Sequence, residues 1–339
     1  MKQPLLEAKK IYNLFLGFIA YNYKIKKSIN SHTTLLIETT NNCNLKCAIC
    51  PRRVMKRAVN NMDHNLFKKI IAETKPYTRF IWLHGMGEPL MDPLLEQRIV
   101  HCKKNNIKAG ISTNAALLTK KRSEALIKAG LDRIILCLDG VKKETYEKIR
   151  VNAEFEKTVA NIKNFLELKK TLKSDIYVML QIIYTDETKK EISKFKETWN
   201  DYPINEIVIK KFNTWGDQTE GIKELSKPEL YYPASNIKKR PACYYLWHSF
   251  VILSDGRVVP CCRDYDAKIV LGDLNNQSLE EIWNSKILKK IREDQINGKF
   301  NNGLCNNCLE YPPIKPTKLI LSINNIKRGI RHLKRGSVG

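Results

Sequence analysis

The sequence lacks a long apolar run, a cleavable signal peptide and any low-complexity tract. No stretch reaches the roughly 18 consecutive apolar residues that a spanning helix needs, so we expect no membrane-crossing segment. Acidic residues are scarce as well, because 35 Asp and Glu stand against 59 Lys and Arg, for a formal net charge of +24. This excess favours an anionic partner, and the charge alone leaves nucleic acid, a phosphate-bearing substrate and a membrane surface open.

The composition is that of a folded protein with metal-holding thiols. With 43% hydrophobic and 28% charged residues, the bulk of the chain is not disordered. A length of 339 residues suffices for a barrel-sized domain and a smaller accessory one. Ten cysteines without a signal peptide predict reduced thiols that bind metal in a reducing cytoplasm, rather than disulfides.

The segment on which this hypothesis depends is a short loop with three cysteines, Cys43, Cys47 and Cys50, in the spacing CxxxCxxC. Three thiolates on one loop can converge on one metal centre, yet they supply one ligand fewer than a closed zinc site or a fully ligated four-iron cluster requires. A cluster held by three cysteines leaves one iron open to a small chelator with amino and carboxylate groups. The alternative is a zinc knuckle that a distant residue completes.

Around this loop, short β-branched runs alternate with helical stretches, which favours βα units and a parallel sheet. We expect helices at 63–74, at 119–129 with Gly130 as its stop, and at 155–171. Six repeats are too few to close an eight-stranded barrel. The six candidate strands are Thr34–Thr39, Arg79–His84, Ile107–Thr113, Arg133–Leu138, Ile176–Ile183 and Glu206–Lys211.

The CxxxCxxC spacing resembles the signature of the radical S-adenosylmethionine (radical SAM) enzymes. The resemblance implies an α/β fold, an open (β/α)6 TIM-type barrel with its chemistry at the C-terminal ends of the strands. It also implies a [4Fe-4S] cluster on Cys43, Cys47 and Cys50, with S-adenosyl-L-methionine (SAM) as the chelator of the open iron.

The same resemblance assigns SAM contacts to motifs at the strand ends, and it assigns no catalytic residue. His84 to Pro89 is similar to the family's GGEP stretch, with Met86 where the second glycine is usual. Cys137 stands where a serine of the family contacts the ribose, and Arg150 corresponds to an arginine that binds the SAM carboxylate. The predicted cofactor-binding residues are Gly85, Met86, Gly87, Glu88, Ser112, Asn114, Cys137, Arg150 and Gln181.

A second cysteine group, Cys243, Cys261, Cys305 and Cys308, can close one further four-iron cluster or a zinc site. Its spacing resembles the SPASM/Twitch accessory domain, and the lack of cysteines after Cys308 favours the shorter Twitch form with one auxiliary [4Fe-4S] cluster. Cys262 is left spare. The predicted organisation is an N-terminal segment at 1–30, a barrel at 31–213, a linker at 214–239, the auxiliary domain at 240–313 and a tail at 314–339.

Both ends of the chain are basic and amphipathic. The aromatic stretch Ile11–Tyr21 is flanked by lysines, and residues 320–335 alternate isoleucine with Lys and Arg. This pattern is typical of peripheral contact with an anionic membrane at its inner face. An N-terminal helix that closes the bottom of the barrel, with a solvated tail, is the alternative.

We therefore expect a radical SAM oxidoreductase that acts on a small polyol, sugar-like or lipid-headgroup substrate. The auxiliary cluster would accept an electron or anchor the substrate, and a ferredoxin or flavodoxin would supply reducing electrons. Peptide or protein maturation is the alternative within the family, although only about thirty residues precede the barrel. A zinc-cluster protein that binds nucleic acid is the alternative from another class, and the lack of repeated finger units disfavours it.

Overall fold

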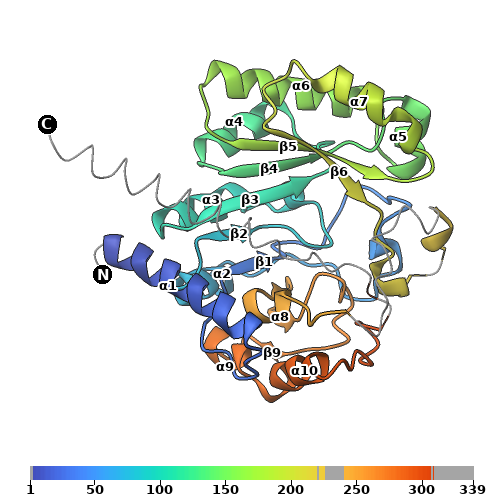
Figure 1. The fold of residues 1–339 in the computed structure, drawn as a ribbon. Helices are drawn as coiled ribbons and strands as arrows, with labels where there is room; N and C mark the ends of the chain where they lie inside the picture. The colour runs from blue at the N-terminus through green and yellow to red at the C-terminus, as the bar shows by residue number, and fades with distance from the viewer. Residues whose placement is uncertain (1–2, 220, 226–239, 307, 309–339) are drawn as a thin grey trace, which may run out of the picture. The chain divides into compact units, whose positions relative to one another are not determined.

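The computed structural model describes residues 3–219, 221–225, 240–306 and 308. Within them the chain forms one nine-stranded sheet in the order β6-β5-β4-β3-β2-β1-β7-β8-β9 (Figure 1). The first six strands are parallel neighbours, as the alternating pattern predicted. The strands are β1 Thr34–Ile37, β2 Phe80–Trp82, β3 Lys108–Thr113, β4 Arg133–Cys137, β5 Tyr177–Tyr184, β6 Glu206–Lys211, β7 Val251–Ile252, β8 Arg257–Val259 and β9 Gly272–Asp273.

The helices follow the local signals in the sequence. Asp63 caps α2, since its side chain accepts a hydrogen bond from the backbone N–H of Leu66. Thr119 caps α4 in the same way. The α-helices are α1 Gln3–Asn22, α2 His64–Thr74, α3 Leu95–Lys104, α4 Lys120–Lys128, α5 Lys143–Ile149, α6 Phe155–Thr171, α7 Ile192–Trp199, α8 Tyr245–His248, α9 Leu279–Trp283 and α10 Lys286–Ile296. Short 3-10 helices are η1 Pro51–Val54, η2 Pro89–Met91, η3 Lys189–Glu191, η4 Trp215–Asp217 and η5 Lys223–Leu225.

The two faces of the parallel strands differ in accessibility. Outward-facing side chains such as Ile81, Ile111 and Leu180 are 0% exposed in the main hydrophobic core. Helices α4 and α6 contact each other beside β4 and β5 (Figure 1). Inward-facing residues that alternate with them, such as Trp82 and Ser112, are half-buried. The inner face of the sheet is therefore partly accessible, and we call the space that it borders the lumen.

The C-terminal part extends the barrel sheet. Strand β7 pairs in parallel with β1, with Leu36 opposite Val251 and Ile37 opposite Ile252. An exposed edge strand invites unwanted pairing, and β7 covers the edge that an open six-stranded barrel leaves at β1. The sequence pattern predicted two domains joined by a linker, and it did not predict this shared sheet. Residues 226–239 of that linker lie outside the described residues.

The N-terminal helix α1 packs on the protein. Its buried face includes Lys10 and Asn13, which donate hydrogen bonds to backbone carbonyls, Lys10 to Asn106 at 2.7 Å and Asn13 to His32 at 3.2 Å. These carbonyl groups lie just before β3 and β1, so α1 covers the N-terminal ends of the barrel strands. This arrangement agrees with the alternative in which an N-terminal helix closes the bottom of the barrel. No helix in the described ranges is long and apolar enough to span a membrane. The predicted basic tail at 314–339 lies outside the described residues.

A buried ion pair allows a test of this packing. Asp92, directly after η2, pairs with Arg98 at 2.9 Å, and both side chains are 0% exposed. We expect Asp92→Ala to lower the free energy of unfolding by about 3–5 kcal/mol, because Arg98 would keep a buried charge without its partner. Lys148→Ala is the control, since its pair with Glu187 is exposed and is worth about 1 kcal/mol or less. Urea denaturation of both variants provides the comparison, and equal losses would contradict the packing described.

Candidate cofactor site and barrel lumen

The three cysteines of the first loop follow β1 at the C-terminal end of the barrel strands. Burial raises the pKa of the Cys43 thiol to about 12 and that of Cys50 to about 11, and the neighbouring thiols add to both shifts. Hydrogen bonds from the backbone of Leu45 and Arg52 oppose the rise. Buried thiols in mutual electrostatic contact favour a soft, positively charged group that keeps them as thiolates, and this donor set fits an iron–sulfur cluster.

The fit rests on the chemistry of the donors and on their shared loop. Across the described ranges, no three His, Cys, Asp or Glu side chains are arranged to hold a metal ion. None of the ten cysteines forms a disulfide. All of them therefore remain available as thiols.

The turn after β2 is packed against the start of the cysteine loop. A Cβ on Gly87 would lie 2.4 Å from the carbonyl oxygen of Thr40 and 2.7 Å from that of Asn42, so the backbones touch only because residue 87 is glycine. The backbone N–H of Met86 donates to Glu38 at 3.0 Å. A Cβ on Gly85 would meet the Glu38 side chain at 2.6 Å. The glycines of this turn thus position the cysteine loop.

The Glu88 side chain is turned into the protein, and the assignment of this turn to SAM stays a prediction. Its carboxylate is 3% exposed and accepts hydrogen bonds from the Thr113 hydroxyl at 2.6 Å and the Asn114 backbone at 2.8 Å. The backbone of Leu90 donates a third, at 3.1 Å. A buried carboxylate needs such donors, and Glu88 uses them to tie the turn after β2 to the end of β3.

Asn114 links the end of β3 to the cysteine loop. Its side-chain nitrogen donates to the Asn44 side chain at 3.0 Å, and Asn44 directly follows Cys43. This contact places Asn114, a predicted cofactor-binding residue, beside the cysteine loop.

Three other predicted residues come together inside the lumen, from three adjacent strands. The Ser112 hydroxyl lies 3.3 Å from the Cys137 sulfur, and the Gln181 amide donates to the same sulfur at 3.7 Å. Cys137 and Gln181 are directly opposite in the β4–β5 register. Burial raises the pKa of the Cys137 thiol, so it stays protonated and serves as a neutral polar group at neutral pH.

Arg150 is held by a residue to which the sequence assigned no role. Its Nε and Nη2 donate to Asp139 Oδ2 at 2.7 and 2.6 Å, while Nη1 lies 3.6 Å from the Cys47 sulfur. The guanidinium is therefore fixed beside the first cysteine group. Asp139 already accepts hydrogen bonds from the two nitrogens that a SAM carboxylate would need for a bidentate contact with Arg150.

Sequence reasoning missed the buried pair of Glu38 and Arg57. The two side chains form two hydrogen bonds of 2.9 Å, and Ser254, in the turn between β7 and β8, donates to the same carboxylate at 3.0 Å. The available signal was a glutamate directly after the apolar strand that precedes the cysteine motif. Its partners lie far apart in the sequence, so spacing could not reveal them.

The second cysteine group gathers near α10. Burial raises the pKa of Cys243 to about 12 and raises that of Cys261 and Cys305, and each thiol interacts electrostatically with at least one other of the group. Gln295 donates to the Cys305 sulfur at 3.3 Å and accepts from the Cys243 backbone at 2.7 Å. Cys308 is buried as well.

Arg240 supports the loop between Cys305 and Cys308. It donates to the carbonyl oxygens of these two residues at 2.5 and 2.8 Å. Cys262 is exposed. The four predicted ligands therefore come from three separate segments that the fold draws together.

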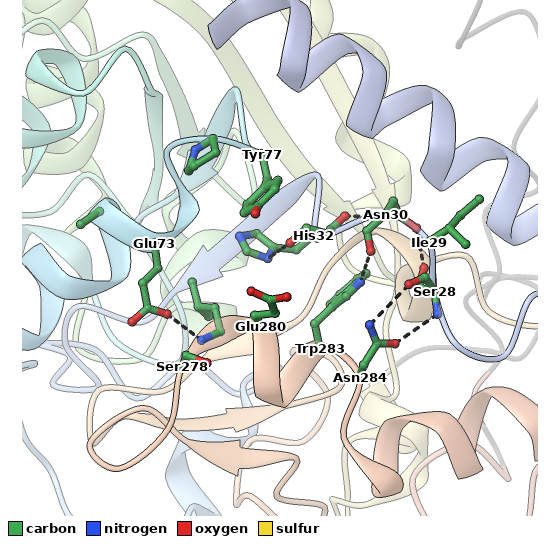
Figure 2. Close-up of a pocket in the computed structure, with 14 residues that line it drawn as sticks. Ser28, Ile29, Asn30, His32, Glu73, Tyr77, Ser278, Glu280, Trp283 and Asn284 are labelled. Atoms are coloured by element: carbon green, nitrogen blue, oxygen red, sulfur yellow. Dashed lines mark hydrogen bonds between the residues drawn. The ribbon is translucent and has the colours of Figure 1, made fainter. Parts of the chain in front are cut away.

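A cavity of about 590 Å³ lies at the other end of the barrel, beside the segments that precede β1 and β2 (Figure 2). Its polar groups are already paired: the indole N–H of Trp283 donates to Asn30 at 2.6 Å, and Glu73 accepts from the Leu279 backbone at 2.7 Å. None of the predicted site residues lines it. The cavity is therefore separate from the cysteine site.

Two family profiles match the chain. The radical SAM superfamily matches residues 37–195. The SPASM iron-sulfur cluster-binding domain matches residues 243–309. The first match contains the cysteine loop and the strand-end motifs, and the second contains the later cysteines.

Curated relatives extend over most of the chain. A tungsten-containing aldehyde ferredoxin oxidoreductase cofactor-modifying protein of Pyrococcus furiosus is 26% identical over 290 residues, which cover 74% of this chain and 81% of the relative. An S-adenosyl-L-methionine-dependent 2-deoxy-scyllo-inosamine dehydrogenase of Niallia circulans is 22% identical over 281 residues, 80% of this chain and 90% of the relative.

Solved structures share the fold. BtrN in complex with AdoMet and 2-DOIA aligns with a TM-score of 0.55 and 19% identity, over 82% of this chain and 92% of that one. SuiB of Streptococcus suis, bound to the precursor peptide SuiA, aligns with a TM-score of 0.59 and 16% identity, over 86% and 74%. At these identities the likeness concerns the fold alone.

The contact between Gly87 and the cysteine loop generates a prediction. We expect Gly87→Ala to weaken SAM binding by about tenfold or more, because the added Cβ forces the loop away from the turn. Calorimetric titration of anaerobically reconstituted protein measures the effect. Gly298→Ala is the control, since no atom lies within 4 Å of its Cβ and only the strain of a positive φ applies. Equal SAM affinity in both variants would reject the positioning role.

Proposed function

The chain belongs to the radical SAM superfamily and carries a SPASM domain, and we propose that it oxidises a small hydroxyl-bearing molecule inside its barrel. The radical SAM domain implies a [4Fe-4S] cluster with SAM, and the SPASM domain implies auxiliary iron–sulfur chemistry. The observation that carries the proposal is the accessible inner face of the sheet, whose side chains at the cysteine end are polar.

In this proposal Cys43, Cys47 and Cys50 hold the first cluster, and the second group, Cys243, Cys261, Cys305 and Cys308, holds one auxiliary cluster. When bound, these groups and SAM supply a 5′-deoxyadenosyl radical that removes one hydrogen atom from a substrate carbon, and an acceptor for the remaining electron. A ferredoxin or flavodoxin is the proposed electron donor.

The chain's own residues orient the reactants. Arg150, fixed by Asp139, places an N–H beside the Cys47 sulfur, and such hydrogen bonds stabilise a cluster thiolate. Glu88 and Gly87 hold the turn after β2 in place. Ser112 and Gln181 present hydrogen-bonding groups to the lumen, where the adenosyl part of SAM and the substrate would meet.

The likeness to an inosamine dehydrogenase supports a polyol-like substrate, because it covers 80% of this chain and 90% of that relative. A peptide substrate is the second candidate, favoured by the shared fold with a structure bound to a precursor peptide. A lumen lined by Ser112, Cys137 and Gln181 offers polar contacts for the hydroxyls of a small molecule, and this observation supports the polyol as the first candidate.

Cluster content and SAM cleavage test the proposal. We expect about eight irons per chain after anaerobic reconstitution, and release of 5′-deoxyadenosine with dithionite, since two four-iron clusters are proposed. Cys47→Ala should retain about four irons and release no 5′-deoxyadenosine, because the first cluster would lose one of only three ligands. Iron assay and product chromatography provide the measurement.

Cys262→Ala is the matched control, since Cys262 lies beside the proposed ligand Cys261 and is itself exposed. This variant should keep the iron content and the cleavage of the parent protein. SAM cleavage that persists in Cys47→Ala would refute the assignment of the first site. Deuterium transfer from a labelled polyol into 5′-deoxyadenosine would separate that substrate class from a peptide.

A further inference from the structure

The lumen contains a cation to which the cofactor motifs assign no role. Lys210 lies on β6 with a half-buried side chain, while its neighbour Lys211 is exposed on the outer face. In the β5–β6 register Gln181 lies opposite Val208 and Ile183 lies opposite Lys210, so Lys210 is on the same, inner face of the sheet as Gln181. The charge of Lys210 also lowers the pKa of Cys137 and of His84, which agrees with this placement. Within the described part of the chain, this ammonium group makes no hydrogen bond and no ion pair.

Lys210 and His84 both belong to the inner face of the sheet, since His84 lies two positions after the inward-facing Trp82. They belong to β6 and to the end of β2, four positions apart in the sheet order. Adjacent strands are about 4.8 Å apart, so these strands would be separated by about 19 Å in a flat sheet. In a sheet that curves into an open barrel the inner faces of these strands turn toward each other, and the effect of Lys210 on the pKa of His84 agrees with such an approach.

His84 presents an unsatisfied neutral ring nitrogen. Burial lowers its pKa to about 4, with Lys210 as a further cause, so the imidazole is uncharged at neutral pH. Its Nδ1 is buried and has no hydrogen-bond partner. A buried polar atom without a partner is costly, and a ligand hydroxyl in the lumen would satisfy it.

An aromatic surface lies beside these two groups. The ring of Trp82 is 5.2 Å from that of His84, and 4.8 Å from that of Phe80. A Cβ on Gly110 would meet the Trp82 ring at 2.8 Å, so the glycine on β3 makes room for the indole inside the lumen. The flat ring offers an apolar contact for the carbon skeleton of a small ligand.

Two other charged groups near the strand ends are paired with counter-ions. Glu38 pairs with Arg57 at 2.9 Å. Asp139 pairs with Arg150 at 2.6 Å. Lys210 is thus a half-buried cation without a counter-ion among the described residues, and burial of such a charge favours an anionic ligand.

We propose that the lumen is a binding site for a phosphorylated polyol, in which Lys210 binds the phosphate, His84 binds a hydroxyl and Trp82 contacts the carbon ring. This proposal names a substrate class for the proposed function. The reaction rests on the proposed function, whereas the binding of the phosphorylated polyol does not. The shared ligand chemistry is a phosphate with neighbouring hydroxyls, which a free sugar phosphate and the headgroup of a phosphoinositide-type lipid both carry.

Calorimetric titration of the reconstituted full chain, with SAM present, tests the site. Glucose 6-phosphate should bind about tenfold or more tightly than glucose, and inorganic phosphate should compete with it, because a hydrogen bond to a charged group is worth about 1.5–3 kcal/mol. Lys210→Met should abolish this preference, and Lys210→Arg should retain most of it. Lys211→Met is the matched control, since it removes the same charge from the outer face of the same strand.

His84→Phe tests the second contact, because the ring and its packing on Trp82 remain while the nitrogen is lost. It should weaken glucose 6-phosphate several-fold and leave inorganic phosphate unchanged. The inference is overturned if glucose and its phosphate bind equally, if neither phosphate binds, or if Lys210→Met weakens SAM binding in parallel. Weaker SAM binding in Lys210→Met would mean that Lys210 contacts SAM instead of the phosphate.

Two further experiments distinguish a free metabolite from a lipid headgroup, and the proposed binding site from the proposed function. Soluble inositol phosphate and vesicles with about 20% phosphatidylinositol distinguish a free metabolite from a lipid headgroup. Whichever of the two binds, its binding must depend on Lys210. Cys47→Ala changes none of the residues proposed to bind the phosphorylated polyol, so phosphate binding that persists while SAM cleavage is lost supports the binding site independently. Absence of SAM cleavage in the parent protein would reject the proposed function and leave the binding result standing.

Discussion

The carboxylate of Glu38 is the contact on which the arrangement of the site depends. It is 1% exposed, and a charge so deeply buried is stable only when donors surround it. The donors come from three parts of the chain: Arg57 after the cysteine loop, the Met86 backbone in the turn after β2, and Ser254 in the C-terminal part. Neutralising one charge thus brings the cysteine loop, the glycine turn and the auxiliary region to the same end of β1.

This contact works together with the shared sheet. Strand β7 pairs with β1, and the Glu38 backbone donates to Ile252 at 2.8 Å. Arg57 also donates to the carbonyl oxygen of Tyr265 at 2.6 Å, in the segment that follows the second cysteine motif. The segments that carry the two cysteine groups are therefore connected through backbone pairing and buried hydrogen bonds.

Much of the fold followed from local patterns. Alternating β-branched runs predicted all six barrel strands, and the caps at Asp63 and Thr119 set the starts of two helices, because these signals act between residues close in sequence. The cysteine and glycine motifs predicted which segments surround the cofactor site. The partners of individual side chains were less accessible from the sequence: the Glu88 carboxylate binds Thr113 and Asn114, and Arg150 is bound by Asp139. A buried side chain's partner depends on which strand ends meet, and one chain's sequence does not contain that information in its spacing.

By itself the sequence determined the chemistry that is available: three thiols on one loop, four more further on, a glycine-rich turn and a strongly basic surface. Only the tertiary structure decided which polar groups share the lumen. Lys210 carries no motif and lies far from His84 in the chain, and the two share the inner face because a parallel sheet with a regular twist curves through the strands between them. Local sequence patterns determine where each strand lies in the chain, whereas the curvature of the assembled sheet determines which side chains lie across the lumen from one another.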